Sequence, residues 1–200
     1  MHAILVSVGT GGDIFPYIGI GREMRARGHR VTVVVPENFE ACVKEHGLEF
    51  RPIVSIAENR ELLSNPDFWH WIKAARLAAR WGMRFVERQY RLIAELAADQ
   101  DAVIVANPGV VAAKIVAEKF GKPLASVILQ PGLIPSSIAP PVMLGYPFPR
   151  RTPRLALRLF WRALDAFGDV LVGRDINKIR VSIGLHRPAT GWMAYFTSTP

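Results

Sequence analysis

The sequence predicts an α/β fold in which a parallel β-sheet carries helices on both faces. Short apolar runs rich in β-branched residues alternate with helical patterns over residues 1–130, and glycine, proline and asparagine mark the turns between them. Strands separated by helices pair in parallel through right-handed crossovers. This alternation is typical of a Rossmann-like domain.

The expected elements follow one another with short connections. Buried strands are expected over residues 4–8, 30–35, 48–53, 101–106 and 123–129. Helices are expected over residues 14–27, 37–46, 67–98, 108–120, 154–172 and 175–183. The alternation pauses after Ile53. Asn65 and Pro66 then suit the start of the long helix, which is expected to bend near Gly82.

Length and composition limit the classes of protein that fit. Two hundred residues, 50% of them hydrophobic, can form one domain with a substantial core. The single cysteine, Cys42, excludes a disulfide framework and a cysteine metal site. No signal-peptide pattern or membrane-spanning apolar run is present, so a cytoplasmic protein is expected, with any membrane contact peripheral. The formal net charge of +8 favours an anionic partner.

The last third of the chain departs from the alternation of strands and helices. Prolines recur between residues 131 and 153 and cannot donate ladder hydrogen bonds, so this stretch is expected to be an ordered surface loop. Residues 154–184 are expected to be helical, and residues 185–200 to begin a link toward a further domain. In this prediction residues 1–200 form one Rossmann-like domain.

The first strand runs directly into a glycine-rich turn, Gly9-Thr10-Gly11-Gly12, which is followed by Asp13. Glycines permit positive φ angles and a close approach of backbone N–H groups to a ligand. Asp13 falls at the carboxyl end of the first strand, where open α/β sheets place their ligands. The turn is therefore the leading candidate for a functional element.

Three interpretations of this turn are open. As a dinucleotide fingerprint it lacks the third glycine, because Ile14 stands there, although Glu37 could imitate the ribose-binding acid. A Walker-type phosphate loop fails because no Lys-Ser/Thr pair follows the glycines. As a structural turn, the glycines bend the chain and Asp13 caps the helix. As a catalytic element, Asp13 is a general base toward an acceptor hydroxyl.

The run Val8–Tyr17, followed by Arg25–Thr32, resembles the N-terminal half of GT-B glycosyltransferases. It is most similar to the group that holds sterol glucosyltransferases, glycopeptide-antibiotic glycosyltransferases and the catalytic rhamnosyltransferase subunit of rhamnolipid synthesis. The similarity extends through residues 1–5, 45–50, 175–180 and 184–185. It therefore covers most of the chain.

The resemblance implies a hexosyltransferase that moves a sugar from a nucleotide diphosphate donor to a hydroxyl of a lipid-like or hydrophobic acceptor, with inversion. Asp13 matches the aspartate proposed as general base in glycopeptide-type members, and Gly9, Thr10, Gly11 and Gly12 would face the diphosphate of the donor. Family members use no cofactor and usually no divalent metal. They hold the donor mainly in a second Rossmann-like domain, which is absent here, so this acceptor half is expected to be inactive alone.

The acceptor side of the cleft is predicted from topology, because loops at the carboxyl ends of parallel strands converge. Asn107 and Pro108 follow the fourth strand, and Gln130 and Pro131 follow the fifth. Asn107 either hydrogen-bonds an acceptor or caps the next helix, and the prolines either line the site or only form turns. The five histidines show no ligand spacing, so no metal site is predicted.

Two helices are expected to carry basic stripes beside apolar ones. The long helix holds Lys73, Arg76, Arg80, Arg84, Arg88 and Arg91, and the helix from residue 154 follows with Arg151, Arg154, Arg158 and Arg162. Such stripes suit an anionic membrane surface that supplies a lipid acceptor, or are the solvated faces of ordinary amphipathic helices.

The predicted partners are a nucleotide sugar, a hydrophobic or lipid acceptor and, peripherally, the inner face of the membrane. No nucleic-acid partner is predicted because no reader module is visible. Two alternatives to the enzyme stay open at this stage. One is a non-catalytic binding or membrane-recruiting module of a split enzyme, and the other is a dinucleotide-binding enzyme.

Overall fold

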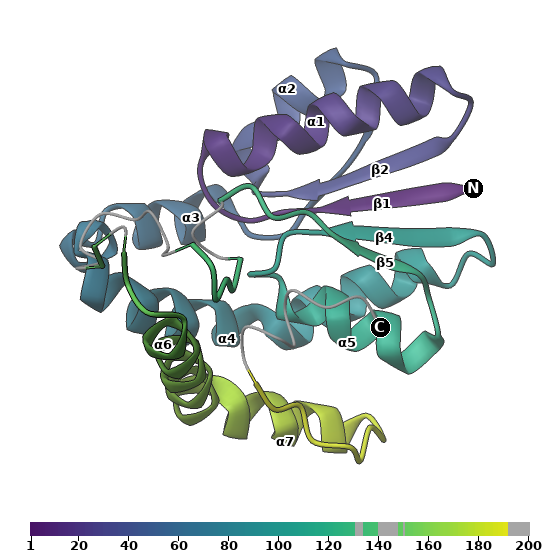
Figure 1. Cartoon of the computed structure of the whole chain (residues 1–200). Coiled ribbons are helices and arrows are strands. Elements are labelled where there is room, and N and C mark those ends of the chain that lie inside the picture. Colours follow the sequence, from purple (N-terminus) through teal and green to yellow (C-terminus); the bar gives the residue numbers. More distant parts are fainter. Residues whose placement is uncertain (131–133, 140–147, 150, 192–200) are drawn as a thin grey trace.

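A five-stranded parallel sheet forms the centre of the chain. The computed structural model describes residues 1–130, 134–139, 148–149 and 151–191 (Figure 1). The strand order is β3-β2-β1-β4-β5, and each neighbouring pair is parallel. The strands are β1 (His2–Val6), β2 (Arg30–Val35), β3 (Glu49–Pro52), β4 (Ala102–Ala106) and β5 (Leu124–Ser126). The predicted Rossmann-like parallel sheet is confirmed.

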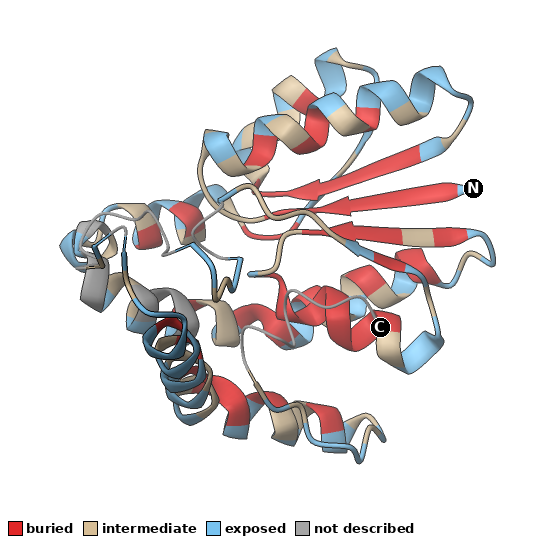
Figure 2. Cartoon of the chain, viewed as in Figure 1, coloured by how far each residue is buried: buried red, intermediate tan, exposed pale blue. Residues whose placement is uncertain are grey.

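Helices cover both faces of this sheet, as predicted. Helices α1 (Gly11–Ala26) and α2 (Glu40–Glu45) lie on one face, whereas α4 (Trp71–Ala97) and α5 (Val111–Phe120) lie on the other (Figure 1). Strands β1, β2 and β4 are largely buried between the two layers (Figure 2). Their β-branched side chains alternate between an α1-side core and an α4/α5-side core.

The structure differs from the prediction between residues 54 and 70, where no helix was assigned before Asn65. Helix α3 (Ile56–Leu63) forms there, because Ser55 and Glu58 make a reciprocal capping box. Asn65 does cap a helical turn, but this is the short 3-10 element η2 (Pro66–Trp69), and α4 begins afterwards at Trp71. Helix α4 then continues to Ala97 as one uninterrupted helix that includes Gly82.

Strand β5 is shorter than predicted and ends at Ser126. Val127 still donates to the Ala106 carbonyl across 3.0 Å, after which residues 128–130 leave the sheet and enter the wall of a pocket. The edge of the sheet therefore contributes a loop to the site rather than two more paired residues.

Two helices occupy most of the predicted helical region 154–184. They are α6 (Arg154–Gly168) and α7 (Arg174–Ser182), joined by the π-helical turn η4 (Asp169–Gly173), so α6 ends four residues earlier than predicted. Ile176 of α7 is buried in the same core as α4 and α5. Much of the predicted proline-rich loop 131–153 and of the link 185–200 lies outside the described residues. Among the helices that the structure describes, none combines the length and the apolar composition that a membrane span requires.

Candidate functional site

A pocket of about 240 Å³ lies at the carboxyl ends of β1, β4 and β5. Loops after these strands form one side of it, and α3, η2 and α4 form the other. Its lining comprises Val8, Gly9, Asp13, Pro36, Val54, Asn59, Leu62, Phe68, Trp81, Gly82, Val86, Gln89, Asn107, Pro108, Gly109, Val111, Ile128, Leu129 and Gln130. Open parallel sheets place their ligands at this edge.

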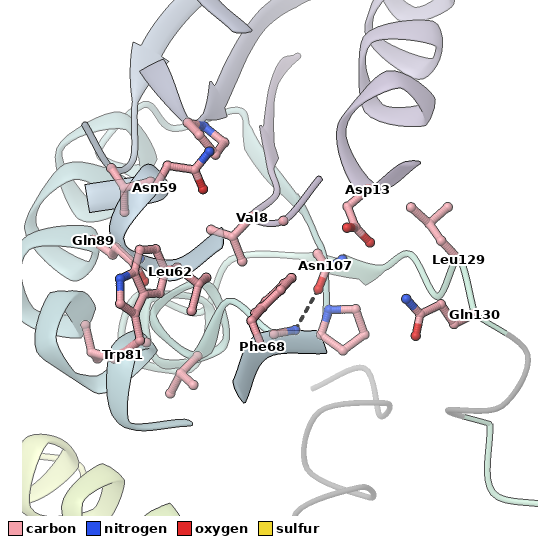
Figure 3. Close-up of a pocket in the computed structure, with 18 of the residues that line it drawn as sticks. Val8, Asp13, Asn59, Leu62, Phe68, Trp81, Gln89, Asn107, Leu129 and Gln130 are labelled. Carbon is pink, nitrogen blue, oxygen red and sulfur yellow. Dashed lines mark hydrogen bonds between the residues drawn. The ribbon is translucent and has the colours of Figure 1, made fainter. Parts of the chain in front are cut away.

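The pocket has two chemically different ends (Figure 3). Asp13 and Gln130 lie at one end, which we call the Asp13 end. Asn59, Trp81 and Gln89 lie at the opposite end, which we call the helical end. Mostly apolar side chains, together with Asn107, line the space between them, so a ligand that spans the pocket meets a carboxylate, a mostly apolar middle and a group of neutral polar side chains.

Among the described residues that line the pocket, Asp13 is the only carboxylate. Its Oδ2 accepts a hydrogen bond from the Thr10 N–H at 2.9 Å and another from the Thr10 hydroxyl at 3.3 Å. Its Oδ1 has no hydrogen-bond partner in the described part of the chain. The side chain is therefore both a cap of α1 and an acceptor with one oxygen to spare, so capping and catalysis do not exclude one another.

Tyr17, one turn along α1 from Asp13, is fully buried and donates a hydrogen bond to the Val127 carbonyl at 3.5 Å. Burial raises the pKa of the Tyr17 phenol far above its usual value, and the negative charge of Asp13 raises it further. The Tyr17 phenol consequently stays neutral.

Gly9 is required where it stands. Its φ is +129°, a conformation that residues with a side chain rarely adopt. A Cβ at this position would also overlap the Asp13 carboxylate. By contrast, the nearest neighbour of a Cβ on Gly12 would be the Thr10 hydroxyl at 3.9 Å. The turn therefore depends on Gly9 for the position of Asp13, and much less on Gly12.

The pocket brings together five of the nine residues predicted from the sequence. They are Gly9, Asp13, Asn107, Pro108 and Gln130. Thr10, Gly11 and Gly12 do not line it, and the Thr10 N–H is already bound to Asp13 rather than free for a diphosphate. Pro131 lies outside the described residues.

The Asn107 side chain does not cap α5, and its oxygen already accepts a hydrogen bond. Its Oδ1 accepts a hydrogen bond from the Gly109 N–H at 2.8 Å and closes a turn with Pro108 (Figure 3). Helix α5 starts later, after Val110, without a side-chain cap. The Asn107 amide is thus held at the pocket wall with its NH₂ group still available as a donor.

The helical end was not predicted from the sequence. Asn59 and Gln89 are each only 4% exposed, and Trp81 is 8% exposed. The Asn59 amide nitrogen donates to Asn38 at 2.9 Å. Within the described residues, neither the Trp81 Nε1 nor the Gln89 amide has a hydrogen-bond partner. Buried polar groups without partners are uncommon, so these donors and acceptors are available to a ligand.

Two sequence signals could have pointed to this end. Ser55-x-x-Glu58 is a capping-box pattern, which predicts the start of a helix where α3 begins. Gln89 is a polar residue on the apolar stripe of α4, four positions after Phe85 and four before Ile93. These residues come together only because α3 packs against α4. This is a long-range contact, and local sequence patterns do not predict it.

Ion pairs hold α3 against α4 behind the helical end. Arg88 donates to both oxygens of Glu58, at 2.9 and 2.7 Å, and Arg84 pairs with Glu61 at 2.6 Å. The hydrogen bonds from Arg88, together with those from the Ser55 N–H and hydroxyl, lower the pKa of Glu58 to about 2. Arg88 also lies over the Phe85 ring, 4.9 Å from its centre.

The lining does not fit a metal or a dinucleotide. In the part of the chain that the structure describes, no group of three or more potential metal ligands comes together. A pyrophosphate at the N-terminus of α1 would meet the Asp13 carboxylate, which already holds the Thr10 N–H. This geometry argues against the dinucleotide interpretation.

The family model that matches the chain is the glycosyltransferase family 28 N-terminal domain, over residues 3–131. The chain belongs to this family. The matched residues include all of the sheet except His2, and the glycine-rich turn with Asp13. The predicted resemblance to GT-B glycosyltransferases is confirmed.

Individual relatives agree with this assignment. An uncharacterized glycosyltransferase of Mycobacterium tuberculosis is 30% identical over 176 residues, which cover 84% of this chain and 42% of that protein. A sterol 3-beta-glucosyltransferase of Pichia angusta is 39% identical over 49 residues, 24% of this chain and 4% of that protein. The chain spans less than half the length of the relatives that it matches.

Solved structures with the same fold include a glycosyltransferase of kitacinnamycin, with a TM-score of 0.64 and 16% identity. The match covers 98% of this chain and 43% of that one. A Streptomyces glycosyltransferase, SsfS6, complexed with thymidine diphosphate has a TM-score of 0.59 and 17% identity, covering 94% of this chain and 47% of that one. These matches establish the GT-B type of α/β fold.

Proposed function

We propose that the chain is the acceptor-binding half of an inverting glycosyltransferase, with Asp13 as the general base. The observation that carries the proposal is the Asp13 carboxylate at one end of a pocket whose lining is otherwise neutral and mostly apolar. A lone carboxylate in such a place is suited to accept the proton of a bound hydroxyl.

In the proposed reaction, an acceptor hydroxyl donates a hydrogen bond to Oδ1 of Asp13. The hydroxyl oxygen attacks the anomeric carbon of the sugar while Asp13 takes its proton, and the nucleoside diphosphate leaves from the opposite face of that carbon. Attack opposite the leaving group inverts the anomeric configuration. The bonds from Thr10 to Oδ2 keep the carboxylate aimed, so most of the catalytic effect comes from positioning.

The lining of the pocket supports a hydrophobic acceptor. Leu62, Phe68 and Val86 offer apolar contact between the two ends. The Trp81 Nε1 and the Gln89 amide at the helical end would bind a second polar group of the acceptor, such as a carbonyl or hydroxyl. The proposed acceptor is therefore a lipid-like molecule with its reacting hydroxyl at one end and a hydrogen-bonding group at the other.

The proposed donor is a nucleotide diphosphate sugar. One structural neighbour is complexed with thymidine diphosphate, which supports a donor of this kind for the family fold. The chain corresponds to less than half of such proteins, so the proposed donor site is completed by a second domain. No cofactor and no metal ion takes part in the proposed step.

The test is sugar transfer by the whole protein, using nucleotide diphosphate sugars and hydroxylated hydrophobic acceptors. Wild type is expected to form a glycoside of inverted configuration, identified by NMR of the anomeric proton. Asp13→Asn keeps the shape of the side chain but cannot take a proton, so transfer is expected to fall about a hundredfold or more. Normal transfer by Asp13→Asn, or a retained configuration, would refute the proposed role. Acceptor binding without any transfer would favour a non-catalytic binding module.

A further inference from the structure

Helix α6 is apolar on two opposite sides. On its inner side, Leu157, Trp161 and Gly168 are buried, which fixes the helix to the rest of the chain. On its outer side, Leu155 and Leu159 are 68% and 57% exposed. An apolar outer face is unusual for a helix whose inner face is already packed.

A neighbouring loop extends this exposed apolar surface. The Trp161 Nε1 donates to the Ser136 carbonyl at 2.9 Å, which holds residues 134–139 beside α6. Ile138 in this loop is 75% exposed. A groove of about 580 Å³ runs between the loop and the helix, lined by Pro135, Ser136, Ser137, Leu155, Arg158, Leu159, Trp161 and Arg162.

The arginines beside this surface have no carboxylate partners in the described part of the chain. Arg151, Arg154, Arg158 and Arg162 are all exposed, and none of them makes an ion pair within the described residues. On α4, by contrast, Lys73, Arg84, Arg88 and Arg91 pair with Asp67, Glu61, Glu58 and Glu87. Within the described residues, four of the six basic side chains of the α4 stripe have carboxylate partners and Arg76 and Arg80 have none, whereas none of the four arginines beside α6 has one.

We propose that the outer face of α6, together with residues 134–139, docks on a bilayer that contains anionic phospholipids. Leu155, Leu159 and Ile138 enter the acyl region, and Arg158 and Arg162 at the groove bind lipid phosphates. Exposed leucines beside unpaired arginines complement such a surface in both polarity and charge. This inference does not depend on Asp13 or on the proposed transfer reaction.

The test is co-sedimentation of the full chain with vesicles of phosphatidylcholine, with and without phosphatidylglycerol. Wild type is expected to bind the anionic vesicles and to lose binding as salt rises. The double variant Leu155→Ser/Leu159→Ser is expected to weaken binding about tenfold or more while its melting temperature stays unchanged, because both side chains are exposed. Arg158→Gln/Arg162→Gln is expected to weaken it to a similar extent.

The matched control is Arg84→Gln/Arg91→Gln, which removes the same charge from α4 where both arginines already have carboxylate partners. Its affinity for anionic vesicles is expected to stay within about twofold of that of wild type. The proposal is overturned if wild type does not bind anionic vesicles, or if this control weakens binding as much as the α6 variant. It is also overturned if wild type is a dimer that Leu155→Ser/Leu159→Ser dissociates, since a second copy would then cover the face.

Discussion

The two ends of the pocket are positioned by different kinds of interaction. At the Asp13 end, the backbone sets the geometry: Gly9 has a positive φ, and the Thr10 N–H binds the carboxylate. At the helical end, side chains set it, because the Arg88–Glu58 ion pair joins α4 to α3 behind Trp81 and Gln89.

This difference matches the work proposed for each end. Proton transfer needs one oxygen held within a fraction of an ångström, and a short turn tied to a buried strand provides that rigidity. Binding of the acceptor body needs a wall of packed side chains, and residues of α3 and α4 provide it. The ends should therefore respond differently to substitution.

The largest effect is expected from Gly9→Ala. The new Cβ overlaps the Asp13 carboxylate and meets an unfavourable φ, so transfer is expected to fall about a hundredfold and stability by about 1–3 kcal/mol. Gly12→Ala is the matched control, because its Cβ meets only Thr10 at 3.9 Å. Kinetic assays and thermal melts of the two variants measure the contrast. Equal losses of activity and stability in Gly9→Ala and Gly12→Ala would show that both glycines act only through general backbone flexibility.

A smaller effect is expected from Trp81→Phe at the helical end. The change removes the Nε1 donor, so the KM for an acceptor with a second polar group is expected to rise about tenfold. An analogue that lacks this group should bind both proteins alike. Tyr90→Phe removes a hydroxyl from the same helix outside the pocket and serves as control. A rise in KM with both acceptors would assign Trp81 a packing role only.

The smallest effect is expected from the ion pair behind the helical end. Because the pKa of Glu58 is lowered from 4.5 to about 2, its stabilisation is present above pH 4.5 and is lost as the pH falls toward 2. The free energy of unfolding of Glu58→Gln at pH 7 is expected to be about 1 kcal/mol lower than that of wild type. Its stability is also expected to lose the pH dependence that comes from Glu58.

The control for this pair is Glu87→Gln, whose carboxylate makes a more exposed contact of 3.8 Å with Arg91. Its unfolding free energy should change by less than about 0.5 kcal/mol. Urea unfolding of both variants between pH 2 and 7 measures the difference. If the unfolding free energy of Glu58→Gln depends on pH in the same way as that of wild type, the Arg88–Glu58 ion pair does not contribute to stability.

The sequence was most informative where function depends on local pattern. A buried strand, a glycine turn and an acidic residue follow one another directly, so the fold and the place of Asp13 could be predicted. Asn107 and Gln130 were found the same way, as polar residues just after apolar strands. Parallel topology alone brings such strand ends together.

The helical end could not be predicted in this way, since it depends on which helices meet. Trp81 belongs to an apolar stripe that is indistinguishable from ordinary core in the sequence. The basic stripe of α4 illustrates the same limit. Arg84 and Arg88 suggested a membrane surface, but their charges are matched by Glu61 and Glu58 of a helix that the prediction did not contain.

The central claim is that Asp13 acts on the reacting hydroxyl while the helical end only binds the acceptor. One steady-state assay of the whole protein with a bifunctional hydrophobic acceptor tests it, comparing Asp13→Asn with Gln89→Met. Asp13→Asn is expected to lower kcat about a hundredfold with little change in KM, and Gln89→Met to raise KM about tenfold with little change in kcat. An unchanged kcat for Asp13→Asn, or a kcat that falls equally in both variants, would contradict the claim.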